Sequence, residues 1–340
     1  MGRTARQDDA VMPSKTCGTI LCGLALLASF RVSAAVSLRS TALDSTPTDC
    51  AQSQRLSIRG GDIRLIFDAN EFALNVTQIC AWVERSGLAV GNYFDGFPVR
   101  TVRIAFEAVD ARNVATGAAY GSADGGPLIV IKLGRTADQA ALDRDWVMTH
   151  EMVHLAVPSV PERSHWLEEG IATYIEPIAR AQLGQLSEEK VWNDMVRDMP
   201  QGLPKPGDRG LDRTPTWGRT YWGGALFCLL ADVEIRQRTN NRMSLRDALR
   251  GVLTAGGNIQ HDWTPEMIFA AADKATGVSV LGELYRKMST APGIAELDGL
   301  WQRLGVSRGD NGVAFDGAAP LSEIREAMTA PSQAAGKRPS

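Results

Sequence analysis

The sequence of 340 residues predicts an α+β fold with two lobes, a small mixed-sheet lobe followed by a mostly helical lobe. Two observations predict this arrangement: short apolar segments with strand-like alternation precede residue 134, and helical periodicity dominates residues 136–304. The composition, with 44% hydrophobic and 22% charged residues, is typical of a globular domain. The length allows one large domain or two modest ones.

The first 35 residues are expected to be a targeting segment rather than part of the fold. A basic start precedes an apolar run at residues 16–30, and the small residues at 32–35 are of the kind that a signal peptidase accepts. The run is shorter than the roughly 20 residues of a membrane-spanning helix. We therefore expect a cleaved signal peptide at 1–35, a secreted or periplasmic protein, and no stable membrane insertion. An uncleaved anchor is the alternative, and Met12 is an alternative start.

Three cysteines follow the expected signal peptide. In an oxidising compartment Cys50 and Cys80 can form a disulfide, which would tie the N-terminus of the mature chain to the first helix. Cys228 lies in an apolar run and is expected to be a buried free thiol. The chain contains no CxxC pair, which argues against a cysteine zinc site.

The sheet lobe is expected to follow a loose lead-in at residues 36–60, which is rich in Ser, Thr, Asp and Pro. Alternation of apolar and polar residues predicts half-buried strands, and a Gly-rich turn joins the last two strands into a hairpin. In chain order we expect a strand at 64–67, a helix at 71–90, a strand at 99–106, and paired strands at 117–122 and 128–133.

A helix is expected over residues 136–155. Thr136 can cap its first turn, and Gln139 three residues later completes a capping box. Pro158 and Pro161 then forbid continuation of the helix, because proline lacks the backbone N–H and clashes with the preceding turn.

A second helix is expected to begin near Ser164 and to pass Glu176, with Pro177 kinking or ending it. The Pro- and Gly-rich loop at residues 199–217 is long enough to suggest a functional role, such as one wall of a cleft. The expected organisation is a signal peptide at 1–35, a lead-in at 36–60, a main domain at 61–305 divided into 61–156 and 157–305, and a partly disordered tail at 306–340.

The most informative motif is the pentapeptide His-Glu-Met-Val-His at residues 150–154. His150 and His154 are four residues apart, so on a helix both imidazoles lie on one face and can bind a single metal ion. Glu151 projects away from that face and can take a proton from an attacking water, which is the chemistry of the HExxH motif of metalloproteases. The alternative is a helix whose two histidines only hydrogen-bond to neighbouring backbone groups.

A catalytic zinc site needs a third protein ligand, and the segment at 165–174 resembles the second helix of the gluzincin metallopeptidases. In that family a W-L-x-E-G-x-A segment carries the metal-binding glutamate before the glycine. The resemblance implies a two-lobed, thermolysin-like metallopeptidase fold with Glu169 as the third ligand. An ordinary solvated glutamate is the alternative for Glu169, and His165 is a competing ligand. The matching residues are Trp166, Leu167, Gly170 and Ala172.

Two glutamates near Glu169 also correspond to positions of the family. Glu168 stands where the family often has an asparagine. Glu176 lies seven residues after Glu169, two turns along the same helix face, and the family often has a glutamate there as well. We expect Glu176 either to hold a ligand histidine from outside the metal site or to be an ordinary surface residue.

The segment Tyr-Trp-Gly-Gly-Ala at residues 221–225 is similar to the Tyr-x-x-Gly-Ala segment of the glycyl aminopeptidase branch of gluzincins. In that branch the tyrosine hydroxyl donates a hydrogen bond to the oxyanion of the transition state. The resemblance implies the same role for Tyr221. A tyrosine packed in the core is the alternative.

The resemblance covers residues 128–250, about a third of the chain, and this sequence departs from the family in two respects. Fourteen residues separate His154 from Glu169, fewer than is usual. The Gly-x-Met-Glu-Asn type of segment that holds a substrate's free amine in related aminopeptidases is missing, and Asp124 is the one acidic residue in the comparable segment, 121–128. This absence favours an endopeptidase, or an enzyme of narrow specificity, over an aminopeptidase.

The resemblance implies one catalytic Zn²⁺ as cofactor and a peptide or protein as substrate. Residues 128–133 are expected to form the edge strand beside the cleft, where backbone groups can pair with an extended peptide, or else to be simple core. The net charge of -3 gives no electrostatic reason to expect a nucleic-acid partner. Two alternatives are a catalytically inactive zinc- or peptide-binding envelope protein that retains the fold, and a structural protein anchored by its signal segment.

Overall fold

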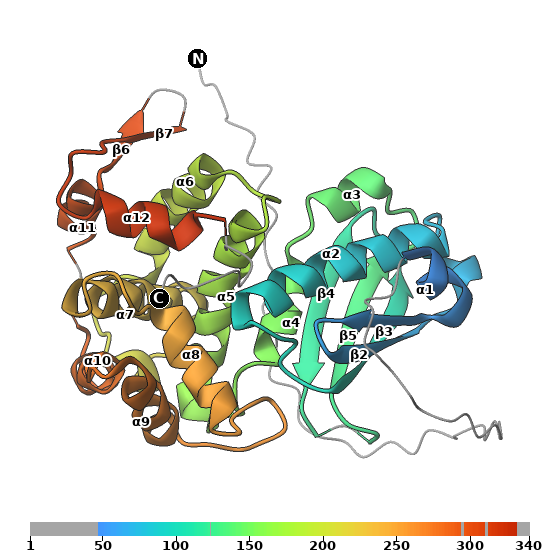
Figure 1. Ribbon diagram of the computed structural model, residues 1–340, viewed down its shortest axis with the longest axis horizontal. Coiled ribbons are helices and arrows are strands. Elements are labelled where there is room, and N and C mark those ends of the chain that lie inside the picture. Colours follow the sequence, from blue (N-terminus) through green and yellow to red (C-terminus); the bar gives the residue numbers. More distant parts are fainter. Residues whose placement is uncertain (1–46, 123, 294–295, 310–311, 332–340) are drawn as a thin grey trace, which may run out of the picture. The chain divides into compact units, whose positions relative to one another are not determined.

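Alternating apolar residues build a five-stranded sheet in the computed structural model, which describes residues 47–122, 124–293, 296–309 and 312–331 (Figure 1). Its strand order is β1-β2-β3-β5-β4. The pairs β2–β3 and β3–β5 are parallel, whereas β1–β2 and β4–β5 are antiparallel, so the predicted mixed sheet is confirmed. The strands are β1 (Arg55–Ile58), β2 (Gly61–Ile66), β3 (Thr101–Val109), β4 (Val114–Tyr120) and β5 (Leu128–Gly134).

One face of the sheet is buried beneath helix α2 (Val76–Phe94), which runs across it in Figure 1. The rings of Trp82 on α2 and Phe106 on β3 lie 5.9 Å apart. The helix begins later than predicted because Asn75 and Gln78 form a reciprocal capping box there. The buried sheet residues follow the period of two that strands require: Ile63, Leu65, Val102, Ile104, Phe106, Ile129, Ile131 and Leu133.

The lead-in that was predicted to be loose contributes two ordered elements, α1 (Pro47–Ser53) and β1. A disulfide between Cys50 and Cys80 joins α1 to α2. Leu56 and Ile58 of β1 are fully buried. The folded domain therefore begins before residue 61, because this segment supplies both a cross-link and core side chains.

The single helix predicted over residues 136–155 is wrong, since two helices occupy this segment. They are α3 (Gln139–Asp143) and α4 (Val147–His154), and the chain leaves the helical conformation between them. Asp138 rather than Thr136 caps the first helix: its carboxylate accepts a hydrogen bond from the backbone within the first turn.

Helices dominate the chain after α4, and the helical region predicted from residue 218 is confirmed. Pro177 lies inside α5 without ending it, and the residues before α7 form a short π-helix, η5 (Arg219–Gly223). The helices are α5 (His165–Gln182), α6 (Glu188–Asp198), α7 (Gly224–Arg238), α8 (Leu245–Thr254), α9 (Pro265–Thr276), α10 (Val280–Met288) and α11 (Leu297–Leu304).

The described part of the tail, residues 306–309 and 312–331, is more ordered than predicted. After α11 the chain forms the antiparallel pair β6 (Val306–Gly309) and β7 (Gly312–Phe315), and then helix α12 (Ser322–Thr329). The Gln182 amide donates a hydrogen bond of 2.7 Å to the Met328 carbonyl, which ties α12 to α5. The prediction from composition was wrong here, because the apolar side of α12 is buried although the surrounding sequence is rich in Ala.

The edge strand of the sheet is β4, so the prediction that residues 128–133 form the edge is wrong. Strand β5 is paired on both sides, parallel to β3 and antiparallel to β4. The predicted hairpin is confirmed, and its first strand, β4, lies outermost. Within the described residues no strand pairs with the other side of β4.

The described residues all belong to one compact unit, so the division into two lobes stays a prediction. Within the same part of the chain, no helix combines the length and the apolar character needed to span a membrane. The predicted signal peptide at 1–35 lies outside the described residues.

The disulfide generates a stability prediction. It closes a loop with a sequence separation of 30 residues. Reduction should lower the free energy of unfolding by about 3–4 kcal/mol, because a cross-link of this span restricts the unfolded chain. Urea denaturation with and without reductant measures the difference. The double variant Cys50→Ser/Cys80→Ser should be insensitive to reductant, and a wild type that is equally insensitive would contradict the prediction.

Candidate metal centre

Helix α4 holds the His-Glu-Met-Val-His motif in a buried position. The Asp145 carboxylate accepts hydrogen bonds from the backbone N–H groups of Val147 and Met148, each 3.0 Å long, and so caps the start of α4. The indole of Trp82 on α2 donates to the same carboxylate at 3.0 Å. These bonds fix the start of α4 against the helix that covers the sheet. His150 is consequently only 4% exposed.

Helix α5 brings Glu169 to the two histidines. The Glu169 Oε2 atom lies 3.2 Å from His150 Nε2 and 3.6 Å from His154 Nε2. One ligand atom from each of the three residues lies within 4.8 Å of the others. The loop between the helices is therefore long enough, although it is shorter than is usual in the family that the sequence resembles.

The chemistry of these three side chains fits a zinc ion. Zn²⁺ in catalytic sites is typically held by three protein ligands, and two imidazoles with one carboxylate are a common set. All three residues are buried or nearly so, and a carboxylate that is 2% exposed needs a compensating positive charge. Histidine nitrogen and carboxylate oxygen together favour zinc over calcium or magnesium, which prefer oxygen ligands.

The electrostatics of the site keep Glu169 ionised. Burial alone would raise the pKa of Glu169, but hydrogen bonds from His150, His154 and His165 hold that pKa well below its usual value. Burial likewise acts to lower the pKa of His154, and the opposing interaction with Glu169 raises it overall. A charged carboxylate is the form in which glutamate binds a metal.

Glu151 faces strand β4. It is 6% exposed, and its carboxylate lies beside Gly117. A side-chain carbon at position 117 would lie only 2.7 Å from Glu151 Oε1, so a larger residue there would displace the Glu151 side chain. The sequence contains a signal for this contact, because a glycine inside a strand often marks a point where another group closely approaches the backbone.

Tyr221 lies in the π-helix η5, beside the same three residues. Its ring stacks near that of His150, with centroids 6.4 Å apart, and near that of Trp217, at 5.7 Å. Burial and the negative charges of Glu169 and Glu151 raise the pKa of Tyr221, so its hydroxyl stays protonated and can donate a hydrogen bond. Trp217 ends the Pro- and Gly-rich loop, which therefore reaches the site.

Close backbone packing places η5 next to Glu169. A side-chain carbon on Gly170 would overlap the backbone of Gly224, and one on Gly224 would overlap the Trp166 carbonyl. The buried Arg219 guanidinium anchors η5 from the other side, 2.8 Å from the Asp208 carboxylate. Helix α5 and the start of α7 can meet this closely only through glycine.

Two other residues that the sequence singled out, Glu176 and Asp124, lie outside this ligand group. The Glu176 carboxylate accepts a hydrogen bond of 2.6 Å from Arg180. Burial raises the pKa of Glu176, while the charges of Arg180 and, more weakly, His150 oppose that rise, so it lies within electrostatic range of a ligand histidine. Asp124 is exposed at the β4–β5 turn, where its carbonyl accepts from Arg103.

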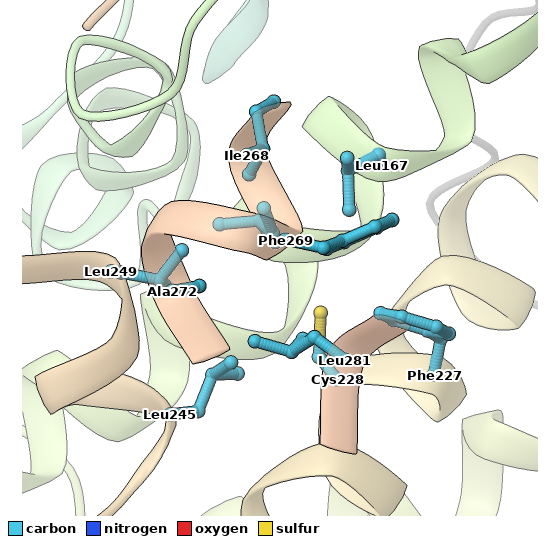
Figure 2. A pocket seen from close by; sticks show the side chains of 10 residues that line it. Leu167, Phe227, Cys228, Leu245, Leu249, Ile268, Phe269, Ala272 and Leu281 are labelled. Carbon is cyan, nitrogen blue, oxygen red and sulfur yellow. The ribbon is translucent and has the colours of Figure 1, made fainter. Parts of the chain in front are cut away.

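A small apolar cavity lies elsewhere, between α5 and the helices α7 to α10 (Figure 2). Leu167, Phe227, Cys228 and Leu281 are among the side chains that line it. Cys228 is a buried free thiol, as predicted, and burial raises its pKa. The lining contains no charged group, so this cavity is packing space in the core and not a second polar site.

The contact between Gly170 and Gly224 predicts that two glycine-to-alanine substitutions in helices change the free energy of unfolding in opposite directions. Gly170→Ala should lower the free energy of unfolding by about 1–3 kcal/mol, because the new carbon overlaps backbone that cannot move aside. Gly299→Ala on α11, where nothing lies near the added carbon, should raise that free energy by about 0.5–1 kcal/mol. Urea denaturation of both variants is the measurement. Equal effects would show that the α5–α7 contact is looser than described.

Neither a known protein-family model nor a curated protein matches this sequence. Solved structures are similar in fold. An aminopeptidase N family protein from Idiomarina loihiensis matches with a TM-score of 0.51 and 12% identity, over 76% of this chain and 51% of that chain. An M1 zinc metallopeptidase from Deinococcus radiodurans matches with a TM-score of 0.45 and 15% identity, over 75% of this chain and 52% of that chain. The chain thus spans about half the length of these structures, and it shares the fold of the aminopeptidase N family protein.

Proposed function

We propose that this protein is a zinc-dependent peptidase whose metal ligands are His150, His154 and Glu169. The observation that carries the proposal is the convergence of these three ligand atoms from two helices within 4.8 Å, in a buried position. The fold that the chain shares with the aminopeptidase N family protein supports the same conclusion. A thermolysin-like division into two lobes, with the cleft between residues 61–156 and 157–305, is part of the proposal.

Two further side chains act on the reacting atoms. A zinc ion in this site would polarise the substrate carbonyl and make a water molecule more acidic. Glu151 takes a proton from the water as the water oxygen bonds to the carbonyl carbon. It then gives that proton to the amine nitrogen as the C–N bond breaks. The protonated Tyr221 hydroxyl donates a hydrogen bond to the carbonyl oxygen as negative charge develops there.

The edge strand β4 is the proposed binding surface for the peptide. Its backbone passes directly against Glu151 at Gly117, and its outer side pairs with no other described strand. An extended peptide that adds to this edge would place a peptide bond beside the general base. This role replaces the one that the sequence suggested for residues 128–133.

The expectation of endopeptidase action has no support, and two observations favour cleavage near the amino terminus. One solved structure of similar fold is named as an aminopeptidase N family protein. In this chain Gly121, which follows β4, lies so close to the Ile259 carbonyl that no side chain fits there, and we propose that this contact limits the substrate at that end of the strand. A substrate that pairs antiparallel with β4, the commoner arrangement, has its amino-terminal side at this end. The chain advances by four residues from Gly117, beside Glu151, to Gly121. At about 3.3 Å per residue this leaves room for about four substrate residues between the general base and that end of the strand.

A catalytically inactive zinc- or peptide-binding envelope protein is the second candidate. The position of Glu151 beside both the ligands and β4 favours catalysis, because binding alone does not require a buried carboxylate there. Export through a cleaved signal peptide, with the mature protein secreted or periplasmic, is proposed for either candidate. The disulfide of Cys50 and Cys80 supports export, because such bonds persist in oxidising compartments.

Three variants test the enzyme proposal. Glu169→Ala should lose bound zinc, whereas Glu151→Gln should keep zinc and lose roughly 10²- to 10⁴-fold in peptide cleavage, because it removes only the base. Glu162→Gln, on an exposed glutamate, is the control and should match the wild type. Metal analysis and cleavage of a peptide library are measured together. Zinc without cleavage in the wild type would favour the inactive binding protein, and no zinc would overturn the proposal.

The proposed limit at the Gly121 end of β4 predicts where peptides are cut. Mass spectrometry of unstructured peptides of increasing length should show release of one to about four amino-terminal residues, independent of total length. Peptides with a bulky cap on the amino group should be cut more slowly. Cuts distributed along the interior of long peptides would show that the Ile259 contact does not limit the substrate, and the endopeptidase alternative would then stand.

A further inference from the structure

The two oxygens of the Glu169 carboxylate have different surroundings. Oε2 faces His150 Nε2 and His154 Nε2 at 3.2 and 3.6 Å. Oε1 instead lies 3.1 Å from Nε2 of a third histidine, His165, at the start of α5. His165 is four residues before Glu169, so the two side chains meet on one face of the helix.

The second ring nitrogen of His165 is also occupied. His165 Nδ1 lies 3.2 Å from Glu168 Oε2. The other oxygen of Glu168 accepts a hydrogen bond of 2.7 Å from the Val160 backbone N–H. A continuous series of hydrogen bonds therefore runs from the loop after α4, through Glu168 and His165, to Glu169.

His165 is placed beside the ligand set and not within it. The group of ligand atoms within 4.8 Å of one another contains His150, His154 and Glu169 alone among the described residues. The His165 side chain is 37% exposed, whereas that of Glu169 is 2% exposed. Each ring nitrogen of His165 thus faces one carboxylate oxygen, Nε2 facing Glu169 and Nδ1 facing Glu168.

We propose that His165, itself held by Glu168, is a positioning residue that engages Oε1 of Glu169 so that only Oε2 is presented to the metal. This inference rests on the proposed metal site. Groups that hydrogen-bond to metal ligands orient them and raise metal affinity. The arrangement also suits the short connection from α4 to α5, because the bond from Val160 ties the first turn of α5 to that loop.

The test is the zinc dissociation constant, measured by competition with a coloured chelator on the purified chain. His165→Ala should weaken zinc binding by about 10- to 100-fold, and His165→Gln, which keeps one donor, should lose less. His261→Ala is the matched control, since His261 is an exposed histidine for which the structure gives no contact with the ligands. The melting temperature of the metal-free variants should stay close to that of the metal-free wild type.

A second readout separates positioning from general stability. The visible spectrum of the Co²⁺-loaded protein reports coordination, and it should change in His165→Ala and Glu168→Ala but not in His261→Ala. Unchanged zinc affinity and an unchanged spectrum in His165→Ala would overturn the inference while leaving the peptidase proposal intact. A loss as large as that of Glu169→Ala would show that His165 is a ligand, which also overturns it. Absence of zinc binding in the wild type would instead defeat the proposed function itself.

Discussion

Burial of the Glu169 carboxylate among three imidazoles is the interaction on which the site depends. An ionised carboxylate that is 2% exposed is costly unless positive charge and hydrogen-bond donors surround it. Here the donors come from both α4 and α5, so the two helices must keep their mutual position for the carboxylate to be tolerated. The same requirement makes a metal ion a natural occupant, because Zn²⁺ supplies the compensating charge.

Close backbone contacts allow the other groups to reach this carboxylate. Gly117 lets β4 pass against Glu151, and the pair of Gly170 and Gly224 lets η5 approach α5 until Tyr221 lies beside His150. A larger residue at Gly170 or Gly224 would overlap backbone, and one at Gly117 would displace the Glu151 side chain. The candidate general base, the candidate hydrogen-bond donor and the edge strand thus come from three separate parts of the chain.

Much of this could be predicted from local pattern, and the errors also have local causes. The spacing of His150 and His154 makes sense only on a helix, and strand alternation correctly predicted the buried sheet face. The single helix over 136–155 was wrong because Asp138 and Asp145 each bond to nearby backbone N–H groups and so start separate helices. The ordered segments around Cys50 and in α12 were missed because composition does not reveal cross-links or packing partners.

By itself, the sequence determined which side chains can do chemistry and on which helix faces they lie, because helical geometry relates residues four apart without reference to the rest of the chain. Only the tertiary structure decided which of these side chains share a site. It placed Glu169 rather than His165 within the ligand group, made β4 rather than β5 the edge strand, and brought Gly121 against the Ile259 carbonyl. These outcomes depend on how distant segments pack against one another, and no local pattern specifies that packing.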